Sequence, residues 1–154
     1  MTAVRGRGAA MTPLDETTTA QPIRVSKIRK PAQARFYESV EAGHSSHDRS
    51  AKIAEWLGTS RSSVRLDSNA KCATVARGET DVYLRLPTRS DYIEKIWDHA
   101  AGVLIVEEAG GTVTDITGRP LEFHHGPLLQ ANRGVVMTNG LLHEQVLEAI
   151  ADSD

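Results

Sequence analysis

Residues 95–111 of this 154-residue chain read KIWDHAAGVLIVEEAGG, and much of the architecture follows from them. The unbroken apolar run at 103–106 is typical of a helix that is covered on several sides, and Gly110-Gly111 is a stop signal. Asp98 falls in the first turn, where the partial positive charge of a helix start favours an anionic side chain. The small residues at 100–102 would let another backbone, a metal ion or a phosphate approach closely.

Two interpretations of Asp98 stay open on spacing alone. An aspartate in a first turn is a common capping device, so it fits a buried helix with an acidic start. The same carboxylate, next to a turn of small side chains, is also available as an oxygen ligand for a cation.

The composition indicates a soluble protein of one domain, residues 1–154, that is long enough to bury a core. The net charge of −2 implies no general attraction to nucleic acid or to a membrane surface. The sequence holds no long apolar run and no apolar leader, which predicts a cytoplasmic protein. Cys72 is the single cysteine, which excludes an internal disulfide and suits a reducing compartment.

Strand and helix patterns alternate along the chain, which predicts an α/β fold. Strands are expected within residues 1–10, 23–28, 35–40, 63–66, 81–86, 112–115 and 134–138. Helices are expected between Ser45 and Gly58, from Ser68 to Arg77, from the region of Asp98 to Gly110, and from Leu141 to Ala151. Ser45 and Ser68 are the expected N-terminal caps, and residues 11–22 are expected to form a loop.

A second polar cluster, Asp67-Ser68-Asn69-Ala70-Lys71, stands where a predicted strand is followed by a predicted helix. Backbone N–H groups, the Ser68 hydroxyl and the Lys71 ammonium would converge there on one anion. Ordinary capping by Ser68, with Lys71 in solvent, explains the same residues equally well.

Arg85 lies near the end of a predicted strand, and its planar guanidinium is suited to binding phosphate. The alternative for Arg85 is a surface ion pair with Asp81 or Glu79. A Walker-type glycine loop and a Gly-x-Ser-x-Gly turn are both absent from the sequence, so no motif indicates covalent serine or cysteine chemistry.

The histidines do not have the spacing of a zinc site, in which histidine combines with cysteine or carboxylate at short, characteristic intervals. They include His44, His47, His99, His124 and His125. A histidine in a loop before a helix, such as His44, can still donate to a phosphate or stack on a base.

Several separate blocks, in one order, resemble a known family. Residues 96–102 (IWDHAAG) and 108–115 (EAGGTVTD) are similar to the C-terminal signature of the inositol monophosphatase-like superfamily. Residues 38–47 (ESVEAGHSSH), 66–71 and 81–87 (DVYLRLP) resemble, more narrowly, the 3'(2'),5'-bisphosphate nucleotidases of fungi and plants. The resemblance extends from about Ala3 to the end of the chain.

This resemblance implies a layered αβαβα fold and a lithium-sensitive, Mg²⁺-dependent phosphatase. The family removes the 3'-phosphate of 3'-phosphoadenosine 5'-phosphate to give AMP. By position, Asp98 would be a catalytic magnesium ligand that also lies close to the substrate. The substrate itself would be bound by His44, Ser68, Lys71, Arg85 and Asp98.

The chain also departs from the family pattern. The family assembles its metals with an N-terminal glutamate and an Asp-Pro-Ile-Asp-Gly-Thr loop, whereas this sequence contains neither Asp-Pro nor Asp-Gly. Cys72 stands where the family commonly has a tyrosine. The chain therefore resembles the C-terminal half alone, with a mixed sheet flanked by helices, and little activity is expected from it without a complementary N-terminal half.

Three alternatives to a bisphosphate nucleotidase remain. The chain could be an inositol monophosphatase-type enzyme, which would need fewer cationic and ring contacts for its smaller substrate. It could be a binding module that keeps the adenine-nucleotide contacts without the chemistry. It could also be a fragment with no stable fold, since half of a layered sheet exposes an unpaired edge.

Overall fold

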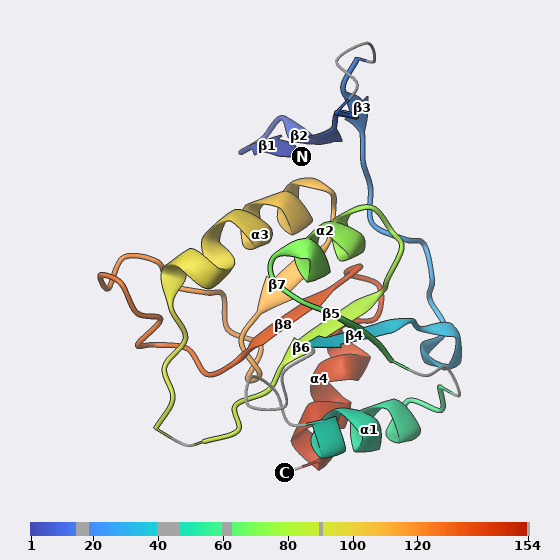
Figure 1. Ribbon diagram of the computed structural model, residues 1–154. Helices are drawn as coiled ribbons and strands as arrows, with labels where there is room; N and C mark the ends of the chain where they lie inside the picture. Colours follow the sequence, from blue (N-terminus) through green and yellow to red (C-terminus); the bar gives the residue numbers. More distant parts are fainter. Residues whose placement is uncertain (15–18, 40–46, 60–62, 90, 154) are drawn as a thin grey trace.

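The computed structural model describes residues 1–14, 19–39, 47–59, 63–89 and 91–153 of the chain (Figure 1). Its centre is a five-stranded mixed sheet with the strand order β5-β4-β6-β8-β7. These strands are β4 (Phe36–Ser39), β5 (Val64–Leu66), β6 (Val82–Arg85), β7 (Thr112–Thr114) and β8 (Val135–Thr138). Strand β4 pairs in parallel with β5 and β6, whereas β8 runs antiparallel to β6 and β7.

Helices cover both faces of this sheet, which confirms the predicted α/β class (Figure 1). One face carries α2 (Ala70–Ala76) and α3 (Ile96–Glu108), and the other carries α1 (His47–Trp56) and α4 (His143–Asp152). A small antiparallel sheet lies on the outer side of α3 and is built from β1 (Thr2–Val4), β2 (Gly8–Met11) and β3 (Gln21–Pro22). A short 3₁₀ helix, η1 (Pro31–Gln33), precedes β4.

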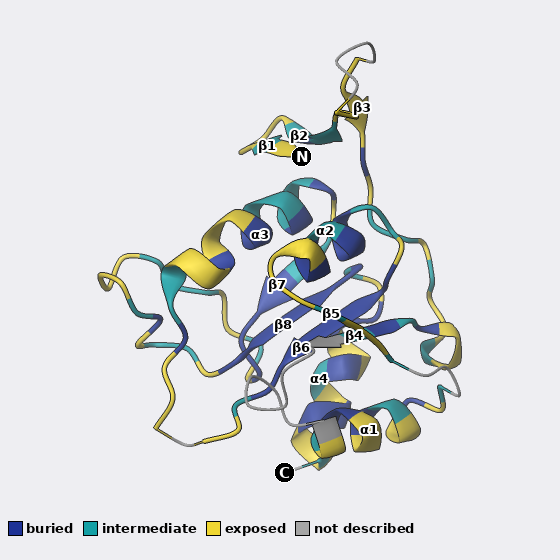
Figure 2. Cartoon of the chain, in the orientation of Figure 1, coloured by how far each residue is buried: buried dark blue, intermediate teal, exposed yellow. Residues whose placement is uncertain are grey.

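Side-chain alternation along β6 divides the core in two. Leu84 packs in a cluster with residues of α1 and α4, whereas Tyr83 packs in a second cluster with residues of α2 and α3. All four residues of β6 are buried, as Figure 2 shows by the dark centre of the sheet. Because successive side chains point to opposite faces, Arg85 lies on the same side as Tyr83, toward α2 and α3.

Glycine sets the distance between α2 and α3. A methyl group built on Gly102 would lie 2.5 Å from Sγ and 2.9 Å from Cβ of Cys72. These separations are far below van der Waals contact, so the two helices can pack this closely only because position 102 has no side chain. Of the three partners expected to approach the small residues at 100–102, the structure places the neighbouring helix α2 against Gly102.

A carboxylate at the end of α3 holds the turn of the N-terminal hairpin. Glu108 accepts hydrogen bonds from the backbone N–H groups of Gly6 and Gly8, both at 2.7 Å. These bonds lower the pKa of Glu108. The single strand expected within residues 1–10 is therefore wrong: the chain turns back at Gly6, whose φ of 76° lies in the left-handed region that glycine tolerates.

The strand expected at residues 23–28 is also wrong: only the Ile23 N–H still bonds to a strand, at the Ala9 carbonyl of β2, and the residues after it bond to scattered partners. Val25 N–H donates to the Ala109 carbonyl, and the Ile28 carbonyl accepts from the Asn139 side chain. Residues 11–22, expected as a loop, contribute Met11 to β2 and Gln21–Pro22 to β3. Residues 15–18 of that segment lie outside the described part.

The other predicted elements are confirmed, with shifts of a few residues at their ends. One cap is wrong: Asn69, not Ser68, precedes α2 as its N-cap, and Ser68 has a φ of 55°. The other expected cap, Ser45, falls outside the described residues. Within the described residues, every helix is too short or too polar to act as a membrane span.

We predict that Gly102→Ala destabilises the fold by about 1–3 kcal/mol, because the added methyl group overpacks the contact with Cys72. In an open helix the same change would stabilise by up to about 1 kcal/mol, so the sign of the effect is diagnostic. Urea unfolding followed by circular dichroism measures it. The Cys72→Ala/Gly102→Ala double variant should recover part of the loss, and a stabilised Gly102→Ala protein would contradict the packing described.

Candidate functional site

A pocket of about 350 Å³ opens where the start of α2, the end of β6 and the start of α3 meet. Its lining is rich in charged and hydroxyl-bearing side chains. These residues are Asp67, Ser68, Asn69, Lys71, Cys72, Tyr83, Arg85, Tyr92, Lys95, Asp98 and His99. The close packing of α2 on α3 at Gly102 brings the two helix starts to one place.

Arg85 lies in the wall of this pocket and is held by a buried carboxylate. Its Nε donates to Glu94 Oε1 at 3.0 Å, and Glu94 Oε2 lies 2.8 Å from Nε2 of His99. Burial lowers the pKa of Arg85, but the Glu94 carboxylate more than offsets this and raises it. Burial likewise raises the pKa of Glu94, but His99 and Arg85 outweigh it, so the Glu94 pKa is lowered and its carboxylate remains charged.

Lys71 is a cation with little compensation. Its side chain is only 6% exposed, and its ammonium lies 3.4 Å from the Leu66 carbonyl and 3.9 Å from an oxygen of Asp67. It also lies 5.5 Å from the centre of the Tyr83 ring. Burial lowers the pKa of Lys71, and Asp67 raises it by less. A buried ammonium with such weak partners would be stabilised by an anion entering the pocket.

Ser68 holds a strained backbone conformation at the mouth of the pocket. Its φ of 55° is in the left-handed region, and its N–H is held by Oδ1 of Asp67 at 2.8 Å. Strain of this kind is typical of functional sites, where the surrounding structure enforces it. The hydroxyl oxygen lies 3.4 Å from the N–H of Ala70, so it turns back on the first residue of the short helix α2.

Asp98 is exposed in the first turn of α3, and it lines the same pocket. Its carboxylate makes no hydrogen bond or ion pair with any residue that the structure describes, which does not support the capping interpretation. A hard cation such as Mg²⁺ prefers carboxylate and water oxygens, so Asp98 fits as one ligand of such an ion. Glu94 does not, because both of its oxygens are already bonded.

The structure places four of the five predicted binding residues around this pocket: Ser68, Lys71, Arg85 and Asp98. The fifth, His44, lies outside the described residues. The alternative ion pairs considered for Arg85 are wrong, since Asp81 binds Arg35 at 2.9 Å and Glu79 binds Arg77 at 2.5 Å. The alternative in which Lys71 lies in solvent is wrong as well.

Sequence reasoning missed Glu94, Tyr92 and Lys95 at this site. All three directly precede α3, and the position of Asp98 in its first turn was the signal that could have indicated them. The sequence suggests His99 only as a candidate zinc ligand, whereas in the structure its partner is Glu94. A larger hollow of about 480 Å³ lies beside Ser26 and Arg35, but Arg35 is bonded to Asp81 there and little polar chemistry remains.

Sequence comparison finds a match to the Inositol monophosphatase family over residues 1–154. The chain is 49% identical over 150 residues to the 3'(2'),5'-bisphosphate nucleotidase of Emericella nidulans, covering 96% of this chain and 43% of that protein. Proteins of the same name from Schizosaccharomyces pombe and Oryza sativa are 43% and 45% identical, over 98% and 96% of the chain. The chain spans less than half the length of these relatives.

Comparison with solved structures finds the same architecture. Mycobacterium tuberculosis SuhB aligns over 99% of this chain and 53% of its own, with a TM-score of 0.70 at 22% identity. The inositol monophosphatase from Anabaena aligns over 97% of this chain and 53% of its own, with a TM-score of 0.66 at 25% identity. These likenesses show the fold.

We predict that Glu94→Gln lowers the free energy of unfolding at neutral pH by about 3 kcal/mol, because it leaves the Arg85 charge buried without its counterion. Glu148→Gln, an exposed site on α4, is the matched control and should change stability by less than about 0.5 kcal/mol. Urea unfolding measures both variants.

Stability should also fall in acid, and less so in Glu94→Gln. The folded pKa of Glu94 lies below its ordinary value of 4.5, so its contribution is present above pH 4.5 and is lost as the pH falls through the folded pKa. Asp81 and Asp115 also have lowered pKa values, so the variant keeps part of the acid sensitivity. Equal pH dependence in the variant and the parent would contradict a charged Glu94.

Proposed function

Because this chain belongs to the inositol monophosphatase family, we propose that it forms the substrate-binding part of a metal-dependent phosphatase acting on adenosine 3',5'-bisphosphate, with AMP as the product. The observation that carries the proposal is the charge arrangement of the α2–α3 pocket. Two buried cations, Lys71 and Arg85, line it together with the carboxylate of Asp98, which has no polar partner in the part of the chain that the structure describes. Cations bind the phosphates, and the carboxylate binds the metal.

The number of cations favours a substrate with two phosphates. Lys71, Arg85 and Lys95 all line the pocket, and although Glu94 already pairs with Arg85, the three side chains together offer N–H donors for more than one phosphate. Arg85 is already oriented by Glu94, so it loses little freedom when it binds a phosphate oxygen. The names of the relatives from Emericella nidulans and Oryza sativa support the same substrate.

Asp98 is the residue of this chain that would hold the metal, and Mg²⁺ is the ion we propose. When bound, such an ion lowers the pKa of the attacking water and stabilises charge on the phosphate oxygens. Asp67 is a poorer ligand, because it already binds the Ser68 N–H and lies near Lys71. Water and further oxygen donors would complete the coordination.

The isolated chain is therefore expected to bind the nucleotide and to hydrolyse it weakly or not at all. A complementary N-terminal segment, supplied as a second chain with Mg²⁺, should restore phosphate release. The proposal includes a cytoplasmic setting, since the single thiol, Cys72, is buried, and burial raises its pKa to about 11. That thiol is inert and needs no oxidising environment.

We predict that Lys71→Met weakens the binding of adenosine 3',5'-bisphosphate at least about tenfold, because a charge-assisted hydrogen bond is lost while the buried stem is kept. Isothermal titration calorimetry without metal measures it. Lys52→Met, at an exposed site on α1, is the matched control and should bind as the parent does.

Competing ligands test the substrate class in the same assay. AMP and inositol 1-phosphate each carry one phosphate and should bind more weakly than the bisphosphate. A Lys71→Met protein that binds normally, or a preference for inositol 1-phosphate, would overturn the nucleotide proposal.

We predict opposite effects of Asp98→Asn with and without metal. Without Mg²⁺ the variant should bind the bisphosphate as tightly as the parent or more tightly, because a negative charge has left an anion site. Addition of Mg²⁺ should strengthen nucleotide binding by the parent and leave the variant unchanged. Equal strengthening in both proteins would remove Asp98 from the metal site.

A further inference from the structure

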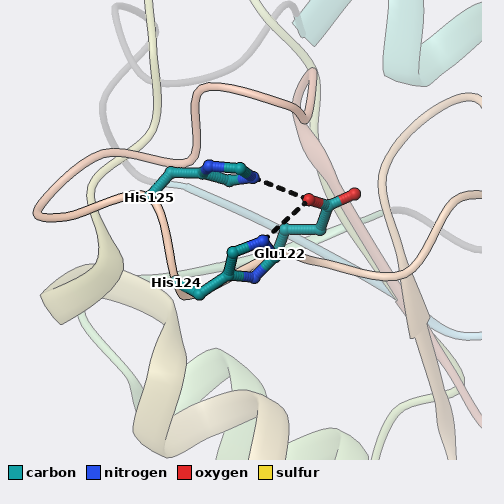
Figure 3. Close-up of side chains that lie close together, drawn as sticks. All are labelled: Glu122, His124 and His125. Atoms are coloured by element: carbon teal, nitrogen blue, oxygen red, sulfur yellow. Dashed lines mark hydrogen bonds and ion pairs between the residues drawn. The ribbon is translucent and has the colours of Figure 1, made fainter.

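Two histidines and a glutamate converge on the surface loop between β7 and β8, away from the residues assigned to phosphate chemistry. The side chains of Glu122, His124 and His125 point toward one another, as Figure 3 shows. His125 Nε2 lies 2.7 Å and His124 Nε2 lies 3.6 Å from Oε2 of Glu122. The potential ligand atoms of all three lie within 4.8 Å of one another.

The two separations from Glu122 are close to those that a tetrahedral ion requires. Zn²⁺ binds imidazole nitrogen and carboxylate oxygen at about 2.0–2.1 Å, which puts neighbouring ligand atoms about 3.3 Å apart. The contact between Glu122 and His124 is already near this value, and the one between Glu122 and His125 must lengthen by about 0.6 Å. All three side chains are partly or largely exposed, so rotation about their own bonds can make this adjustment.

The backbone that carries the triad is fixed at both ends. The Glu122 N–H donates to Oδ1 of Asn132 at 2.8 Å, and the Asn132 side chain also donates to the Pro120 carbonyl at 2.9 Å. Beyond the histidines, the Pro127 carbonyl accepts from the Ile96 N–H at 3.1 Å. A metal would therefore cost little backbone ordering on binding.

We propose that Glu122, His124 and His125 form a surface site for a transition-metal ion of the Zn²⁺ class, with water completing the coordination. Imidazole and carboxylate together suit Zn²⁺, Ni²⁺ and Cu²⁺, whereas Mg²⁺ prefers oxygen alone. This site is thus chemically distinct from the one proposed at Asp98. The spacing of the histidines alone does not favour zinc. The fold adds a third ligand by placing the Glu122 carboxylate against both imidazole rings.

Backbone hydrogen bonds connect the loop that carries this site to the segment before α3, which lines the α2–α3 pocket. The Leu129 N–H donates to the Glu94 carbonyl at 2.8 Å, and Lys95 and Leu128 form an isolated β-bridge. Glu94 and Lys95 belong to the segment before α3, and Glu94 is also the counterion of Arg85. An ion on the loop would stiffen the segment on which the pocket depends.

The test is a titration of the metal-free chain with Zn²⁺, using a chromophoric chelator as competitor, and with Co²⁺, using its visible absorption. We expect one Zn²⁺ per chain, and Co²⁺ absorption of the intensity typical of four or five ligands. His124→Ala, His125→Ala and Glu122→Gln should each weaken Zn²⁺ binding at least about tenfold. Millimolar Mg²⁺ should not displace the Zn²⁺.

The matched control is the His44→Ala/His47→Ala double variant, which removes the other closely spaced histidine pair in the sequence. It should keep the full Zn²⁺ affinity. Loss of binding in that variant, unchanged binding in His125→Ala, or absence of 1:1 binding by the parent would each overturn the proposal. Circular dichroism melting of every variant checks that the fold is intact, and these outcomes do not depend on nucleotide hydrolysis.

Discussion

At Gly102 the backbone of α3 comes against the side chain of Cys72 in α2, closer than any other residue type would permit. The N-terminal ends of both helices are thereby held at one edge of the α2–α3 layer. Lys71 and Ser68 come from one helix start and Asp98 from the other, and all three line the same pocket. The position of the charged groups thus follows from a packing contact in which no charge takes part.

The two buried cations of the pocket, Lys71 and Arg85, differ in how far nearby carboxylates compensate their charges. Arg85 has a full counterion in Glu94, which also holds His99, whereas the partners of Lys71 among the described residues are a carbonyl, a distant carboxylate and the Tyr83 ring. Arg85 is therefore oriented and Lys71 is left in need of an anion. Burying an ammonium in this way costs stability, and the cost is recovered only when a negatively charged ligand binds.

Much of the architecture could be predicted from the sequence because it depends on local patterns. The apolar run at 103–106 predicts a covered helix, and the alternation at 81–86 predicts a strand, without reference to the rest of the chain. The errors arose where the partner is distant in the chain: residues 23–28 alternate like a strand but bond to the end of β2, the end of α3 and the Asn139 side chain, and Arg85 pairs with Glu94 beyond a proline and a turn. The left-handed Ser68 could not be predicted either, since serine is not a residue that signals a positive φ.

The clamp that Glu108 places on the N-terminal hairpin recognises peptide groups, which every residue possesses, and no side chain. Natural selection can therefore act on Glu108 and on the glycines that allow the turn, while the intervening Arg7 is free to drift. Substitutions on the outward-facing side of this hairpin should therefore leave its attachment to α3 intact, whereas Ala9, which packs into the core, is constrained.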